Sequence, residues 1–190
     1  MTEIQKKLLE KKRIDLMGEV NEEMLKYLRE AVQILTIEGN PPLTVLITSG
    51  GGNASMGLDL YDLIKFYPGK KIGLVHGIAA SMAAIILQAC DWRVITPNGR
   101  ILIHHIKCHN FPLTALKNAD ELDKFLKSRA HLFNQYEILT KKTGKEVGEI
   151  LARCEEDEYM PAQEAVQYGL VDQIVETEAE IRTPWQTTTS

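Results

Sequence analysis

Residues 77–90 read GIAASMAAIILQAC, and this stretch decides the fold. Small residues lead to Ser81, and the apolar run after it is typical of a buried helix. A hydroxyl at such a turn can face a cleft while the first helical turn points free backbone N–H groups at an anion beside it. That arrangement suits a serine nucleophile. Close packing with an N-cap serine gives the same pattern, so both interpretations stay open at this point.

The composition is that of a globular protein. The 190 residues are 44% hydrophobic and 25% charged, which predicts one domain with a sizeable core. A net charge of −4 argues against a nucleic-acid-binding surface. The longest apolar run, residues 78–89, is shorter than the roughly 20 residues that cross a bilayer, and no signal peptide is evident. We expect a cytoplasmic protein that binds neither nucleic acid nor membranes.

Strand and helix patterns alternate along the rest of the chain. We expect strands at residues 13–17, 43–48, 71–75, 93–95, 100–106 and 171–175. We expect helices at residues 4–12, 55–66, 120–143, 145–155 and 162–168, and one that Asn21 caps and that runs to about residue 37. This alternation predicts an α/β fold with a mostly parallel sheet. No linker divides the chain, so residues 1–190 form one domain with an N-terminal helix (1–12) and a polar tail (177–190).

Three glycines follow the expected strand 43–48, at Gly50, Gly51 and Gly52. Open α/β sheets form their sites at such strand ends, and glycine lets backbone amides approach a ligand or an oxyanion. A tight turn or a phosphate loop would look similar. No Lys-Ser/Thr pair follows Gly52, which argues against nucleotide binding.

A serine nucleophile needs a base, and histidine suits that role. His104 and His105 end the segment RILIHH, where adjacent strand residues face opposite sides, so one of the two can face a given site. His104, His105, Cys108 and His109 also lie within six residues, but this spacing matches no common zinc pattern. The three cysteines lack CxxC spacing and predict no disulfide framework. We expect no metal and no cofactor.

Four blocks together resemble the proteolytic subunit of Clp protease, the caseinolytic serine peptidase family. They are ITSGGGNASMGLDLYDLIKF (47–66), GIAASMAAIILQAC (77–90), PNGRILIHH (97–105) and EEDEYMPAQEAVQYGLVDQIVE (155–176). The likeness runs from about residue 13 to residue 175. It implies a spiral of repeated β-β-α units, as in ClpP and crotonases, with a long protruding helix. Residues 120–143 would form that handle, about 36 Å long as a straight helix.

The resemblance also assigns roles to single residues. It places the nucleophile on Ser81, the general base on His104 and the triad aspartate on Asp157. The sequence alone does not choose Asp157 over the acidic residues at 155, 156 and 158. The family's oxyanion amides fall on Gly52 and Met82. Its substrate-binding positions fall on Gly50, Gly51, His105 and Ile106.

The chain departs from the family pattern at three places. Gly50 replaces a proline, and residues 105–112 replace a Gln-Pro and glycine-containing stretch beside the substrate. The chain also begins about where the family's first helix begins, so we expect no axial loops and leave the use of an ATP-driven unfoldase open. The resemblance otherwise implies peptide or unfolded-protein substrates and a homo-oligomer, either a heptameric ring or two stacked rings.

Three other functions stay open from the sequence. A crotonase-like acyl-CoA enzyme shares the architecture and needs no serine–histidine pair. A structural ring subunit would keep the fold without the chemistry. A serine–lysine dyad would use Lys107 as its base.

Overall fold

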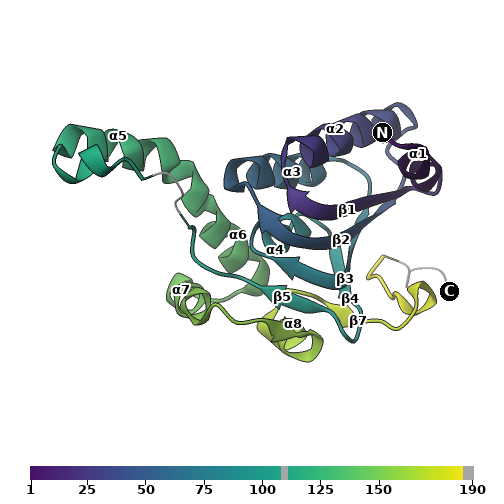
Figure 1. Ribbon diagram of the computed structural model, residues 1–190. Coiled ribbons are helices and arrows are strands. Elements are labelled where there is room, and N and C mark those ends of the chain that lie inside the picture. The colour runs from purple at the N-terminus through teal and green to yellow at the C-terminus, as the bar shows by residue number, and fades with distance from the viewer. Residues whose placement is uncertain (108–110, 186–190) are drawn as a thin grey trace.

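The computed structural model describes residues 1–107 and 111–185 (Figure 1). Its strands are β1 (Arg13–Val20), β2 (Leu43–Gly52), β3 (Lys71–Ala80), β4 (Trp92–Ile95), β5 (Arg100–Leu102), β6 (Met160–Pro161) and β7 (Gln173–Ile174). Within the described residues these form one sheet in the order β1-β2-β3-β4-β7, while β5 pairs with the end of β3 and with β6. Every pairing is parallel except that of β5 with β6. The expected mostly parallel sheet is confirmed.

Helices cover this sheet and extend from it. They are α1 (Glu3–Glu10), α2 (Glu22–Ile37), α3 (Ala54–Phe66), α4 (Met82–Leu87), α5 (Ala119–Arg129), α6 (Asn134–Thr143), α7 (Val147–Glu156) and α8 (Ala162–Tyr168). Three 3-10 turns are η1 (Leu113–Leu116), η2 (Ala130–Phe133) and η3 (Glu178–Glu180). Figure 1 shows α1 to α3 along one side of the sheet, and α5 projecting away from the body. No helix in the described part of the chain is long and apolar enough to cross a membrane.

Local sequence explains where several helices begin. The Asn21 side chain accepts a hydrogen bond from Met24 N at 3.0 Å and caps α2, as expected. Beyond the cap, α2 buries the stripe that contains Leu28, Ala31 and Leu35. All six residues of α4 are buried, because the run MAAIIL offers no polar face. The turn that carries Ser81 is therefore anchored to the core.

The expected strand at 100–106 is too long, because β5 ends at Leu102. Its partner β3 stops at Ala80, opposite Leu102, where the chain turns into α4. Ser81 N then donates to Leu102 O at 2.8 Å and closes the pairing. His104 and His105 lie beyond the strand, so strand alternation does not decide which of them faces the site.

The expected single helix at 120–143 is interrupted. It is α5, then η2, then α6, and Gly144 ends α6 with a φ of 71°. The interruption separates two environments: α6 buries Tyr136 and Leu139 against the body, whereas α5 buries no residue. Leu132 of η2 is buried, and its neighbour His131 contacts Ser55 of α3. The change from α-helix to 3-10 geometry thus falls where residues of this segment first contact the body. The expected polar tail includes η3, and its residues 186–190 lie outside the described residues.

Candidate active site

Ser81 occupies a sharp turn between β3 and α4. Its backbone has φ 56° and ψ −126°, a conformation that costs a non-glycine residue roughly 1–3 kcal/mol. The buried helix α4 and the bond from Ser81 N to Leu102 O hold it there. Met82 N–H belongs to the first turn of α4, where N–H groups have no acceptor within the helix. A strained serine beside open backbone donors is typical of a nucleophile position.

The glycine run at the end of β2 packs directly against this turn. Gly51 has φ +92°, and a Cβ there would lie 2.6 Å from Ser81 Cβ and 2.8 Å from Ala80 O. Gly52 has φ +152°, and its Cβ would lie 2.5 Å from Val20 O. Both positions therefore require glycine for steric reasons. This packing explains the glycine run without a bound phosphate.

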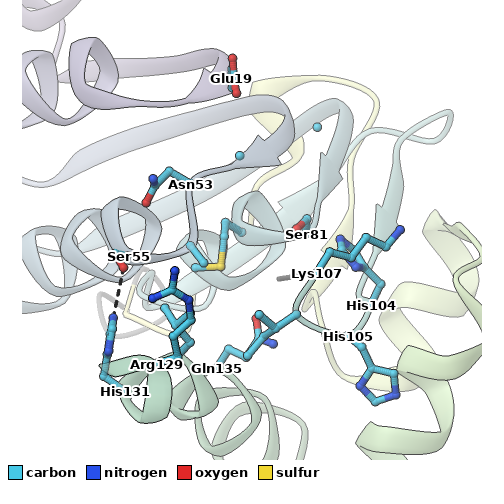
Figure 2. Close-up of a pocket in the computed structure, with 16 residues that line it drawn as sticks. Glu19, Asn53, Ser55, Ser81, His104, His105, Lys107, Arg129, His131 and Gln135 are labelled. Atoms are coloured by element: carbon cyan, nitrogen blue, oxygen red, sulfur yellow. Dashed lines mark hydrogen bonds between the residues drawn. The ribbon is translucent and has the colours of Figure 1, made fainter. Parts of the chain in front are cut away.

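One cavity of about 610 Å³ gathers most of the expected site residues (Figure 2). Its lining includes Ser81, Met82, Gly52 and His104. Of the expected substrate-binding positions, Gly50, His105 and Ile106 line it as well. Gly51 and Asp157 are not among its lining residues. The nucleophile, the base and both expected oxyanion residues thus share a cavity.

The three expected triad side chains are not joined by hydrogen bonds. Within the described residues no such bond links Ser81 to His104 or His104 to Asp157, and His104 Nδ1 is buried without a partner. Asp157, at the end of α7, instead accepts a hydrogen bond from Lys107 Nζ at 3.1 Å. This bond lowers the pKa of the Asp157 carboxyl; burial opposes that shift, and the nearby charges of Lys107 and His104 add to it.

The competing groups near the triad have other partners. His105 Nδ1 lies 3.1 Å from Tyr136 Oη, and its Nε2 lies 3.6 Å from Glu155 Oε1. Figure 2 shows the His105 ring directed away from Ser81. Glu156 pairs with Arg153. Of the two neighbouring histidines, His104 is therefore the one that faces the cavity and has no partner at Nδ1 within the described residues, whereas Asp157 is engaged by Lys107.

A further feature of the molecule is the arrangement of the histidines, acidic residues and cysteines within the described residues. Within residues 1–107 and 111–185 no three histidine, cysteine or acidic residues are placed to hold a metal ion, and Cys108 and His109 lie outside those ranges. Cys90 and Cys154 are free and buried. Burial raises the pKa of Cys90 to about 12 and that of Cys154 to about 11, which keeps both as unreactive thiols.

Sequence reasoning missed several cavity residues. Ser55 Oγ lies 3.1 Å from His131 Nε2, which makes a second serine–histidine pair in the lining. Arg129 also lines the cavity. The sequence contains one indication of this. On a helix at 120–143, Arg129 lies on the same face as the apolar residues Phe125 and Leu132, where another apolar residue would be expected.

The fold and site define a class: α/β proteins in which a serine at a strand-to-helix turn shares a cavity with a histidine near the ends of parallel strands. A family model described as Clp protease matches residues 1–178. The ATP-dependent Clp protease proteolytic subunit 2 of Pseudomonas aeruginosa is 30% identical over 94% of this chain and 88% of its own length. The crystal structure of the ClpP protease catalytic domain from Plasmodium falciparum matches with a TM-score of 0.75 and 27% identity, covering 96% of this chain and 93% of that one.

The chain belongs to the Clp protease family. It is a ClpP-like proteolytic subunit, and family membership makes it, in general terms, a serine endopeptidase. The resemblance expected from the four sequence blocks is confirmed.

Proposed function

We propose that this protein hydrolyses peptide bonds with a Ser81-His104-Asp157 triad. One observation carries the proposal: Ser81, in a strained turn at the start of a buried helix, shares a cavity with His104, Gly52 and Met82. No cofactor is needed. The substrates are peptides or unfolded protein segments that can extend through this cavity.

The reaction is acyl transfer in two halves. His104 takes the proton of Ser81 as Oγ attacks the peptide carbonyl carbon, and the N–H groups of Gly52 and Met82 stabilise the oxyanion. The amine leaves with the proton from His104, which gives an ester on Ser81. Water, deprotonated by His104, then hydrolyses the ester and frees the serine. Asp157 holds the imidazole in the required tautomer and stabilises its charged form.

Catalysis requires two hydrogen bonds that are not formed among the described residues, one between His104 and Ser81 and one between His104 and Asp157. Asp157 must accept a hydrogen bond from His104 Nδ1, for which the Lys107 ammonium on Oδ2 competes. The side chains of Lys107 and Asp157 are 60% and 49% exposed, so their ion pair is weak and easily exchanged. The buried, unpaired Nδ1 favours the exchange, because an unsatisfied polar atom is costly.

We further propose that the chain is a single peptidase domain that assembles into a heptameric ring or a stacked pair of rings. The projecting helix α5 buries nothing within the chain, and Leu126 and Phe133 are 54% and 58% exposed. A second copy could cover them. Light scattering would distinguish about seven or fourteen chains from a monomer.

The Lys107–Asp157 contact also favours a second candidate, a structural ring subunit without activity. A crotonase-like enzyme is the third, and it would bind coenzyme A thioesters without cleaving peptides.

The deciding experiment measures kcat/KM on a set of fluorogenic peptides. We expect Ser81→Ala and His104→Ala each to lose at least a thousandfold, because triad members act as a unit.

Ser55→Ala is the matched control, because Ser55 is the other serine in the cavity that contacts a histidine. We expect this variant to keep wild-type kcat/KM. Full activity of folded Ser81→Ala would refute the proposal, and loss of activity only in Ser55→Ala would move the nucleophile to Ser55. Wild-type protein that assembles but cleaves nothing would favour the structural subunit.

A further inference from the structure

Arg129 places an uncompensated positive charge in the cavity. It sits at the end of α5, it is half-buried, and it lines the same cavity as Ser81. Among the described residues it makes no ion pair with a carboxylate. Its only polar contact there is a long bond from Nη1 to Ser128 Oγ, at 3.4 Å.

An aromatic ring orients the guanidinium. Arg129 Cζ lies 4.7 Å from the centre of the Phe125 ring, which itself packs edge-on against Phe111 at 5.1 Å. A guanidinium that contacts a ring through its face keeps its N–H groups free, because they point outward in the plane of the guanidinium. Two of these N–H groups match the two oxygens of a carboxylate. This contact with Phe125 favours one orientation of the Arg129 guanidinium while most of its donors remain unused within the described residues.

Two other basic groups of the cavity have partners in the resting arrangement. Lys107 is paired with Asp157, and His131 contacts Ser55. Glu19 is the one carboxylate in the lining, and it makes no ion pair within the described residues. Figure 2 shows Glu19 well apart from Arg129, which extends toward the start of α3 near Ser55.

We propose that Arg129 is a specificity residue that binds a peptide carboxylate near the cleaved bond, in the cavity that it shares with Ser81. The proposal rests on the peptidase function above. The carboxylate is that of an aspartate or glutamate side chain, or the carboxyl terminus of a short peptide. In both cases the guanidinium forms two parallel charge-assisted hydrogen bonds to the two oxygens. An apolar or amide side chain at that position leaves this charge unpaired.

The test uses matched fluorogenic peptides. At each position flanking the cleaved bond a glutamate peptide is compared with its glutamine counterpart, and each is made with a free and an amidated carboxyl terminus. We expect wild-type kcat/KM to favour one carboxylate position about tenfold, the low end for a charged hydrogen bond at a half-buried site. Arg129→Gln should lose this preference while still cleaving the glutamine peptides. Arg129→Glu should prefer lysine there instead.

Arg29→Gln is the control, since it removes the same charge from the exposed face of α2, outside the cavity. It should keep the preference. Binding of the same peptides to Ser81→Ala by fluorescence anisotropy gives a readout that does not depend on turnover. Carboxylate peptides should bind more tightly to Ser81→Ala than to Ser81→Ala/Arg129→Gln. Equal binding to both, or no carboxylate preference in an active wild type, overturns the proposal, whereas cleavage by Ser81→Ala would instead overturn the function.

Discussion

Lys107 Nζ lies 3.1 Å from Asp157 Oδ2, and the carboxylate that should orient His104 is therefore held by a lysine. The nitrogen of His104 that would meet it, Nδ1, is buried and unpaired. Lys107 belongs to the segment in which this chain departs from the family pattern. We interpret the contact as a resting arrangement that competes with the assembled triad.

Removing the lysine should raise activity. In Lys107→Met the Asp157 carboxylate loses its competitor and becomes available to His104. Because both side chains are largely exposed, their pair is weak, and we expect a rise in kcat/KM of no more than about fivefold. Wild-type activity should also rise with salt, which screens exposed ion pairs.

Two variants control this prediction. Lys124→Met removes an exposed lysine of α5 that makes no ion pair within the described residues, and it should leave kcat/KM unchanged. In an Asp157→Asn background, Lys107→Met should bring no gain, since the two residues act through one contact. An equal gain in both backgrounds would show that Lys107 acts elsewhere.

Gly51→Ala should disable the site. A Cβ at Gly51 meets Ser81 Cβ and Ala80 O at 2.6 and 2.8 Å, so the turn must shift, and displacing a nucleophile by about 1 Å costs roughly a hundredfold in rate. Gly50→Ala is the neighbouring control, because nothing lies within 4 Å of its Cβ. Thermal unfolding and kcat/KM check both variants. Wild-type activity in folded Gly51→Ala would contradict the packing described here.

Stability should fall at alkaline pH because of the buried thiols. Burial raises the pKa of Cys90 to about 12, above that of an unfolded thiol at about 8.5. The unfolded state alone then loses the proton above pH 8.5, so the free energy of unfolding falls as pH rises. Between pH 7.5 and 9.5 this contribution is on the order of 1 kcal/mol.

Urea unfolding of wild-type protein and Cys90→Ala at both pH values measures that contribution. The variant will be less stable at pH 7.5, because it leaves a small cavity, but its stability should fall by on the order of 1 kcal/mol less between the two values. Because the other titrating groups are the same in both proteins, their contributions cancel when the two pH dependences are subtracted. Identical pH dependence in the two proteins would contradict the burial of Cys90.

Much of the fold could be predicted because its signals are local. The Asn21 cap, the apolar run of α4 and Gly144 at the end of α6 each act within a few residues. The end of β5 depends instead on where its partner β3 stops. The interruption at η2 coincides with the contact of His131 with Ser55, 76 residues away. Helix patterning cannot report such contacts.

Some residues of the candidate site could likewise be predicted from the sequence, whereas others are seen only in the structure. The sequence blocks pointed to Ser81 and His104, and both line one cavity. The pairing of Lys107 with Asp157 joins exposed side chains 50 residues apart, which no local pattern encodes. In the sequence, Arg129 is a charged residue on the helix face that also carries the apolar Phe125 and Leu132. Only the fold shows that Arg129 lines the cavity.

The central claim is that Ser81 is the nucleophile, and its most direct test is to locate the adduct of a fluorophosphonate probe. The native protein is treated with the probe and digested, and the modified residue is identified by peptide mass spectrometry. We predict a single phosphonate on Ser81, with labelling absent from His104→Ala. A phosphonate on Ser55, or undiminished labelling of folded Ser81→Ala, would contradict the account.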